Sequence, residues 1–330
     1  MADYKDIAGT KVQNFSSDPS DPLLGQVWYN TTSTTLKGVV NQTAAWASGG
    51  NINQGRHSHG GACSSKDAGI IFGGRGEPPN PKTSNTESYN GTAWTEVNNL
   101  GTARYGLSGS GTGTAGLAFG GDLTPGTTTS SESWNGTSWT GTPAMNSGGR
   151  FGGGCGTSTS ALCIGRSTNP TGDNGIVESW NGSAWTEITD LNTARPGGSG
   201  LAASNSAAIY AGGDTPANQS VESWNGSAWT EVNDLNTGRT LHGGQAGTQP
   251  KGVVYGGDVP GGQTVNTEDW NGTSWTETAN MSTGRGRGGN GSMGGASSAM
   301  IAGGSPPAGG NSATEEFTGG GNATKTFTTS

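Results

Sequence analysis

The sequence is poor in the residues from which most soluble domains build a core. Apolar residues make up 28% of the 330 positions, and charged residues make up 12%. Such a composition is typical of a disordered chain, because little apolar burial rarely offsets the entropy lost on ordering. Two features argue against disorder: the formal net charge is only −8, and the chain contains 11 Trp. We therefore expect a folded domain whose core depends on indole rings.

Other absences exclude whole classes of protein. Glycine is abundant, at 64 residues, but it follows no strict period of three, which excludes collagen. The chain has no run of 18 apolar residues and no apolar N-terminal stretch, so we expect neither a membrane span nor a signal peptide. A pI near 4.8 with scattered Lys and Arg predicts no nucleic-acid partner. Three cysteines cannot form a disulfide framework.

A phrase such as ESWNGSAWTE recurs five times, at 87–96, 132–141, 178–187, 222–231 and 268–277. Its second Trp recurs at intervals of 45, 46, 44 and 46 residues. An arginine follows most of these Trp by ten residues, and follows Trp139 by eleven. These register arginines start six units: Arg56, Arg104, Arg150, Arg195, Arg239 and Arg285. Each unit also has a short apolar run that ends in Gly-Gly, except the third, which reads ALCIGR.

A period of about 45 residues with four short strands per unit is typical of a β-propeller. The order Arg, Gly-Gly, aromatic residue, Trp resembles the kelch motif over roughly residues 46–317. This resemblance implies an all-β fold, a six-bladed kelch-like β-propeller with a short N-terminal arm. We expect the propeller to occupy 43–330 and the N-terminal segment to occupy 1–42.

The repeated phrase predicts a β-hairpin. Asn-Gly between β-formers favours a two-residue type I′ turn. In the second copy this register pairs Trp134 with Thr137 and Glu132 with Trp139 and gives the hairpin one bulky face. We expect nine hairpin Trp to pack neighbouring units together: Trp94, Trp134, Trp139, Trp180, Trp185, Trp224, Trp229, Trp270 and Trp275.

The glutamate on the Trp face needs a cationic partner, because a carboxylate beside indole rings is costly unless it is paired. The register arginine is the only cation that recurs once per unit, so we expect Glu–Arg pairs within or between units. A functional alternative stays open. The six register arginines, together with His59 and His242, could instead line the mouth of a central channel and bind anions.

Ring closure and the cysteines give further expectations. The last unit lacks Asn-Gly after Phe317, and residues near 43–48 supply a spare strand, so we expect them to complete the sixth unit. The strand near Phe327 would add to it or flank it. Cys155 and Cys163 flank a turn, where buried thiols are favoured over a disulfide, and Cys63 is expected to be a lone core thiol.

Residues 1–40 do not fit the repeat. Gln26–Asn30 and Thr35–Val40 could form a small hairpin around 31–34. The string from Asp21-Pro22 through GQVWYN to Leu36-Lys37 resembles the openings of virion structural proteins from marine bacteriophages. That resemblance implies an attachment or assembly segment, with other virion proteins as partners and location on a particle surface in multiple copies. The alternative is an ordinary arm that caps the propeller.

Three functions follow as hypotheses. The first is a non-enzymatic phage virion protein, decorating the particle or associated with a tail or fibre, that contacts the host surface and its glycans. The second is a free lectin-like propeller. The third is a copper oxidase or glycoside hydrolase, for which the sequence offers little: the histidines lack a recurrent Tyr or thiolate, and no carboxylate pair stands out. We therefore expect no catalytic residues, no metal site and no cofactor.

Overall fold

The computed structural model describes residues 12–76, 82–168, 172–214, 219–305 and 311–327. These residues form strands β1 to β30 and no helix, so the fold is all-β as expected. The chain divides into two compact units. We call Met1–Ala44 with Gly319–Ser330 the terminal module, and Ala45–Thr318 the repeat domain. The sequence places the boundary at 42/43 and assigns everything after it to one domain; the structure instead assigns residues 319–330 to the terminal module.

The terminal module is one four-stranded sheet. Its order is β1 (Gln13–Phe15), β2 (Val27–Asn30), β3 (Thr35–Gln42) and β30 (Gly321–Phe327). The expected hairpin is present, because β2 and β3 pair antiparallel from Asn30–Thr35 to Val27–Gly38. The prediction that the strand near Phe327 adds to or flanks the sixth unit is wrong, because β30 pairs with β3 in the terminal module. Phe327 pairs with Leu36 and its ring packs over Gly38, where a side chain would leave no room.

One carboxylate holds the terminal module together. Asp18 accepts hydrogen bonds from the Trp28 indole at 3.0 Å and the Asn30 amide at 2.7 Å, and it pairs with Lys37 at 2.7 Å. These donors lower the pKa of Asp18 to about 2. Trp28 is fully buried beneath this cluster, so it is the core of the module.

The repeat domain contains six antiparallel groups of four strands, one per sequence unit, which we number as repeats one to six. Repeats one to three are β5 (Gly60–Ser65) to β8 (Trp94–Val97), β9 (Ser108–Thr112) to β12 (Trp139–Thr142), and β13 (Gly153–Gly156) to β16 (Trp185–Ile188). Repeat four is β17 (Ser199–Ser204) to β20 (Trp229–Val232); repeat five is β21 (Gly244–Thr248), β22 (Lys251–Tyr255), β25 (Thr267–Trp270) and β26 (Trp275–Glu277). Repeat six is β27 (Asn290–Gly295), β28 (Ser298–Ala302), β29 (Thr314–Thr318) and β4 (Ala45–Ser48).

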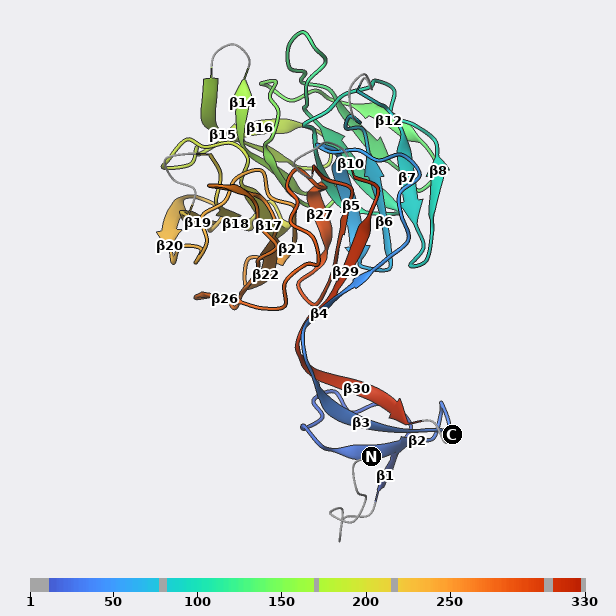
Figure 1. Cartoon of the computed structure of the whole chain (residues 1–330). Helices are drawn as coiled ribbons and strands as arrows, with labels where there is room; N and C mark the ends of the chain where they lie inside the picture. The colour runs from blue at the N-terminus through green and yellow to red at the C-terminus, as the bar shows by residue number, and fades with distance from the viewer. Residues whose placement is uncertain (1–11, 77–81, 169–171, 215–218, 306–310, 328–330) are drawn as a thin grey trace. The chain divides into compact units, whose positions relative to one another are not determined.

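The remaining strands within the repeats have these bounds: β6 Ala68–Phe72, β7 Thr86–Tyr89, β10 Ala115–Phe119, β11 Ser131–Trp134, β14 Ala161–Thr168, β15 Gly172–Trp180, β18 Ala207–Ala211 and β19 Val221–Trp224. A small hairpin, β23 (Asp258–Val259) with β24 (Gly262–Gln263), lies within repeat five. The first strands of the repeats, such as β5, β17 and β27, gather in the middle of the repeat domain, and fourth strands such as β8, β20 and β26 lie at its rim (Figure 1).

The first strands contact one another in a closed cycle, in the order β5, β9, β13, β17, β21, β27 and back to β5. Between repeats six and one this contact is a parallel ladder that pairs Asn290 with Gly60 and joins the two repeats into one eight-stranded sheet. The expectation for residues 43–48 is confirmed. Strand β4 pairs antiparallel with β29, with Trp46 opposite Phe317, so the N-terminal end of the domain completes the last repeat.

The register predicted for the hairpins is wrong, although the hairpins themselves are present. Trp134 pairs directly with Trp139, so the loop has four residues instead of two. Asn135 does not adopt a positive φ, as a type I′ turn requires, whereas Gly136 has φ +92°. The Asn135 side-chain oxygen instead accepts the backbone amides of Thr137 and Ser138, each at 2.9 Å. An Asn side chain that accepts hydrogen bonds from the backbone of the loop in this way favours the longer turn.

The outer tryptophans connect each repeat to the preceding one. Trp139 of repeat two donates its indole N–H to Thr86 of repeat one at 3.0 Å and packs on Phe72 at 4.8 Å. Trp229 donates to the Thr189 carbonyl at 3.0 Å in the same way. Across the seam, Trp94 of repeat one donates to Thr314 of repeat six at 3.0 Å. Eight of the nine predicted Trp are buried, and Trp139 is partly buried.

Glycines in the first strands let the repeats approach closely. A Cβ on Gly109 would lie 2.4 Å from the Gly61 carbonyl oxygen, and one on Gly154 would lie 2.5 Å from the Gly109 carbonyl oxygen. Such contacts are with backbone, which cannot move aside as a side chain can. The abundance of glycine therefore has a packing reason at the centre of the domain.

We expect Gly109→Ala to lower the free energy of unfolding by about 1–3 kcal/mol, because the added methyl group forces adjacent first strands apart. Gly141→Ala is the matched control: it lies in a strand, and a Cβ added there would have no other atom within 4 Å. Urea unfolding should show the control at or above wild-type stability. Equal stability of the two variants would contradict the packing argument.

Candidate functional site

The register arginines form buried ion pairs. Arg56, Arg104, Arg195, Arg239 and Arg285 have side chains that are at most 1% exposed. They pair with Glu87, Glu132, Glu222, Glu268 and Glu315 of their own repeats, at 3.0 Å for Arg104–Glu132 and 2.5 Å for Arg239–Glu268. The Glu–Arg expectation is confirmed for these five. The alternative, in which they bind anions at a channel mouth, is wrong because almost no solvent reaches them.

The second partner of each glutamate was not predicted from the sequence. The other carboxylate oxygen accepts a hydrogen bond from the backbone amide of the residue three positions before the register arginine. Glu268, for example, accepts one from the Asn236 amide at 2.7 Å. The Asn236 side chain also donates to this oxygen at 2.9 Å. Asn53, Asn146 and Asn192 repeat the pattern, and this recurring Asn was the available signal. Such added bonds are what a buried ion pair needs to offset desolvation.

Repeat three departs from this arrangement. Glu178 pairs with Arg166 at 2.7 Å, and both are almost fully buried. Arg150 instead pairs with Asp122 at 2.8 Å and is 27% exposed. The residue of repeat three that corresponds to a register arginine is Gly149. The recurring Asn, here Asn146, precedes it by three residues. Arg150 forms a β-bridge with Ser167, as Tyr105, the residue after a register arginine, does with Asp122. The prediction for Arg150 is therefore wrong by one residue.

The guanidinium in repeat three comes from another point in the chain. Arg166 occupies the place of the second glycine in the Gly-Gly pairs of the other repeats. A Cβ on Gly149 would lie 2.4 Å from Arg166 Cδ, so the Arg166 side chain fills the space that a register arginine would occupy. Repeat three thus has glycine where the other repeats have the register arginine, and arginine where they have the second glycine of Gly-Gly. The eleven-residue spacing and the ALCIGR departure were both signals of this change.

At one end of the repeat domain, six backbone hydrogen bonds form a closed ring. The amide of Gly106 donates to Ser58, Phe151 to Gly106, Gly197 to Phe151, Leu241 to Gly197, Arg287 to Leu241, and Ser58 to Arg287, at 2.7–2.8 Å. Each repeat contributes one residue, and each donates to the preceding repeat. We call these six residues the hydrogen-bonded ring.

All six residues of the hydrogen-bonded ring have positive φ, between 46° for Leu241 and 74° for Gly197. Glycine adopts this conformation freely, but an L side chain costs about 1–2 kcal/mol there. Two of the positions are glycine. The other four carry Ser58, Phe151, Leu241 and Arg287. Strained backbone of this kind is concentrated at functional sites, and it points to this end of the domain.

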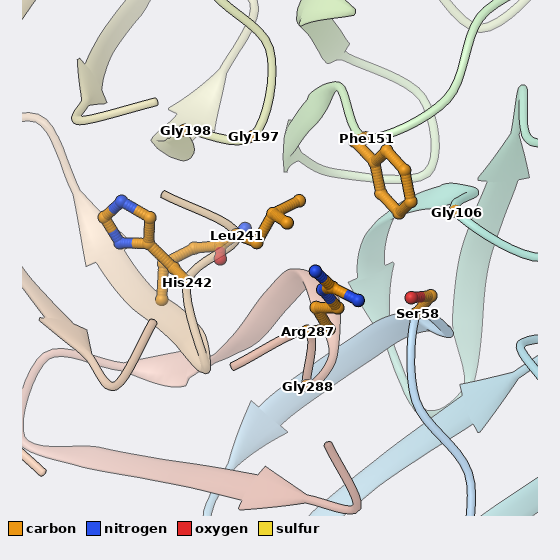
Figure 2. Close-up of a pocket in the computed structure, with 10 residues that line it drawn as sticks. Ser58, Gly106, Phe151, Gly197, Gly198, Leu241, His242, Arg287 and Gly288 are labelled. Atoms are coloured by element: carbon orange, nitrogen blue, oxygen red, sulfur yellow. The ribbon is translucent and has the colours of Figure 1, made fainter. Parts of the chain in front are cut away.

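A pocket opens at the hydrogen-bonded ring. It is lined by Ser58, Phe151, Leu241, Arg287, His242 and Gln245, together with glycines. Figure 2 shows Ser58, Phe151, Leu241 and Arg287 reaching toward one central space from separate segments, with His242 beside it. We call this the ring pocket. Arg287 is 39% exposed and lies 3.2 Å from Asp258, so a guanidinium–carboxylate pair borders a pocket of mixed apolar and polar lining.

A second hollow adjoins the ring pocket, because both are lined by Phe151, Gly197 and Leu241. Its other lining residues include Arg150, Asp214, Thr240 and Ser167. Thr240 Oγ1 is buried and has no hydrogen-bond partner within the protein. The Arg150 guanidinium lies 5.4 Å from the Phe151 ring centre and donates to the Tyr105 hydroxyl at 3.1 Å. The two hollows therefore combine apolar side chains, Phe151 and Leu241, with charged and hydroxyl side chains.

Only one of the two predicted histidines lines the pocket. His59 is fully buried, and its ring nitrogens lie 2.9 Å from the Ala302 carbonyl oxygen and 3.2 Å from that of Gly60. His242 lines the ring pocket. Burial lowers the pKa of His59 to about 4 and that of His242 to about 3, with positive charge from Arg56 and Arg239 adding to the effect. Both are therefore neutral at pH 7.

These lowered pKa values predict acid destabilisation. A histidine whose folded pKa lies below its unfolded value near 6.5 contributes full stability above pH 6.5 and loses it as the pH falls toward the folded pKa. We expect His59 alone to lower the free energy of unfolding by about 2 kcal/mol between pH 7 and pH 5. Thermal unfolding across this range measures the slope. His59→Gln should flatten it, and an unchanged slope in that variant would contradict the assignment.

The possible metal ligands and the thiols were located in the described part of the chain. Among the residues described, no group of three or more His, Cys, Asp and Glu side chains lies together in a way that could hold a metal ion. Cys63, Cys155 and Cys163 are buried free thiols, as expected. Nor does the described chain contain a helix that is long and apolar enough to cross a membrane.

Comparison with known proteins adds no assignment. No model of a known protein family matches this chain, and no curated protein matches its sequence. The ring pocket, its adjoining hollow and the buried Glu–Arg pairs are therefore interpreted from the residues of this chain alone.

Proposed function

We propose that the repeat domain is a six-bladed kelch-like β-propeller that acts as a non-enzymatic recognition domain. The observation that carries this proposal is the closed ring of six hydrogen bonds, with a pocket at its centre lined by side chains from different repeats. Six similar groups of four strands and a closed cycle of first strands support the propeller architecture. Pockets assembled from several repeats are suited to binding, because each repeat can vary its side chain independently of the scaffold.

The terminal module serves, in this proposal, as the attachment segment. It has its own buried core around Trp28, and it exposes apolar side chains at Val12 (46%), Leu23 (73%), Leu24 (57%) and Phe327 (37%). Exposed apolar side chains concentrated in one small module favour a protein partner. Together with the resemblance of residues 21–37 to phage virion proteins, this supports a structural protein of a phage particle, carried in multiple copies and presenting the propeller to host-surface glycans.

The attachment proposal is tested on purified particles. Mass spectrometry of virions from a phage that encodes this chain should detect it in multiple copies. A chain that lacks residues 319–330 loses β30 and should no longer co-purify, whereas Lys251→Ala, in the repeat domain, should co-purify normally. Absence of the full-length chain from the particles would contradict the proposal.

A free lectin-like protein is the second candidate. It is favoured by one observation: every residue that lines the ring pocket belongs to the repeat domain, so the site is complete without the terminal module. Glycan binding by the full chain, combined with its absence from particles, would favour this candidate over the first.

A further inference from the structure

Four side chains of the hydrogen-bonded ring are kept in a conformation that glycine would adopt without strain. Ser58, Phe151, Leu241 and Arg287 have φ of 55°, 58°, 46° and 55°. Glycine occupies the two other equivalent positions, 106 and 197, and it is abundant in the chain, at 64 residues. All four non-glycine side chains line the ring pocket. Strain that is retained at one site, where a strain-free residue is acceptable, indicates a role for the side chains themselves.

The chemistry of these side chains defines what fits. Phe151 and Leu241 are half-buried and form the wall shared by the two hollows, so they present apolar surface to both. Arg287 lines the ring pocket and Arg150 lines the adjoining hollow, and each pairs with its own carboxylate, Asp258 and Asp122. A ligand at the wall therefore meets an apolar face flanked by groups that donate and accept hydrogen bonds.

The arginines of the two hollows have carboxylate partners within the protein. Arg287, which lines the ring pocket, pairs with Asp258, and Arg150, which lines the adjoining hollow, pairs with Asp122. His242, which also lines the ring pocket, is uncharged at pH 7 because burial lowers its pKa to about 3. A ligand with a net charge would disturb these pairs, whereas a neutral polyhydroxylated ligand can bond to both members of a pair.

We propose that the ring pocket and the adjoining hollow together bind a neutral pyranose of a glycan. The C–H face of the sugar packs on Phe151 and Leu241, as apolar faces do on aromatic rings. Its hydroxyl groups accept hydrogen bonds from Arg287 and donate to carboxylates such as Asp214. The buried Thr240 hydroxyl, which has no partner within the protein, lies in the wall of the same site. This inference rests on the proposed recognition function and specifies its ligand class.

The test uses the full chain and two classes of probe. Neutral probes are the methyl pyranosides of galactose, glucose and mannose; the acidic probe is N-acetylneuraminic acid. Saturation-transfer NMR should detect binding of at least one neutral probe, with weaker or no binding of the acidic one. Leu241→Gly and Arg287→Gly should weaken that binding at least tenfold. Their thermal midpoints should stay at or above the wild-type value, because glycine relieves the positive φ.

Lys251→Ala is the control, since Lys251 is exposed in the β21–β22 hairpin and does not line either hollow. It should bind like wild type. The proposal is overturned if no neutral pyranoside binds, if only the acidic probe binds, or if the glycine variants lose stability and keep their affinity. None of these results depends on particle association, so a failure here is distinct from a failure of the attachment proposal.

Discussion

Replacing Arg166 with glycine should lower the free energy of unfolding by about 3–5 kcal/mol, the usual cost of removing one partner of a buried ion pair. Glu178 is fully buried, and Arg166 is its cationic partner at 2.7 Å. Without Arg166, the carboxylate keeps its bonds to the backbone amides of Asn146 and Ser147 but loses its countercharge. Urea unfolding of the variant measures the loss.

A double variant tests whether Arg166 takes the place of a register arginine. Adding Gly149→Arg to Arg166→Gly restores the pattern of the other repeats, with arginine in the register position and glycine after Gly165. We expect this double variant to recover most of the lost stability. Gly149→Arg alone should be destabilising, because its Cβ would lie 2.4 Å from Arg166 Cδ. If the double variant loses as much free energy of unfolding as the two single variants together, the proposed exchange of positions is contradicted.

Trp224→Ala should lower the free energy of unfolding by about 3–5 kcal/mol, the usual range for a buried Trp truncated to Ala. Trp224 is 3% exposed, packs on Trp229 at 5.3 Å and donates its indole N–H to the Asn205 carbonyl at 3.1 Å. It shares a core cluster with Leu162 and Ile164 of the preceding repeat.

Thr230→Ala is the matched control, because Thr230 follows Trp229 on the same strand and is exposed. Chemical denaturation should show it within about 0.5 kcal/mol of wild type. A small effect for Trp224→Ala would contradict the view that indole rings replace aliphatic side chains as the core of this domain.

Much of the repeat domain was predictable because its pattern recurs. The five copies of the Trp phrase located the hairpins, and the cost of burying Glu87 or Glu268 beside indole rings predicted their arginine partners. The loop length was not predictable from Asn-Gly alone. Whether Asn135 adopts a positive φ or caps the loop with its side chain depends on a small energy difference that the dipeptide does not reveal.

The parts that broke the repeat were harder to predict. Arg150 sits one residue beyond the register, and only the position of Asn146 shows that Gly149 is the equivalent residue. The pairing of Phe327 with Leu36 joins segments from opposite ends of the chain, and no local pattern encodes such a contact. The ring pocket was missed for a similar reason, since its four non-glycine ring residues share no residue type and meet only when the six repeats close.

Amide hydrogen exchange at the hydrogen-bonded ring is the most direct test of the closed architecture. The amides of Ser58, Gly106, Phe151, Gly197, Leu241 and Arg287 each donate to the neighbouring repeat. If the six repeats form one closed circle, all six amides should be protected together, at a free energy close to that of global unfolding. Exchange of the Ser58 amide at the rate of an open loop, while the other five stay protected, would show that the circle is not closed between repeats six and one.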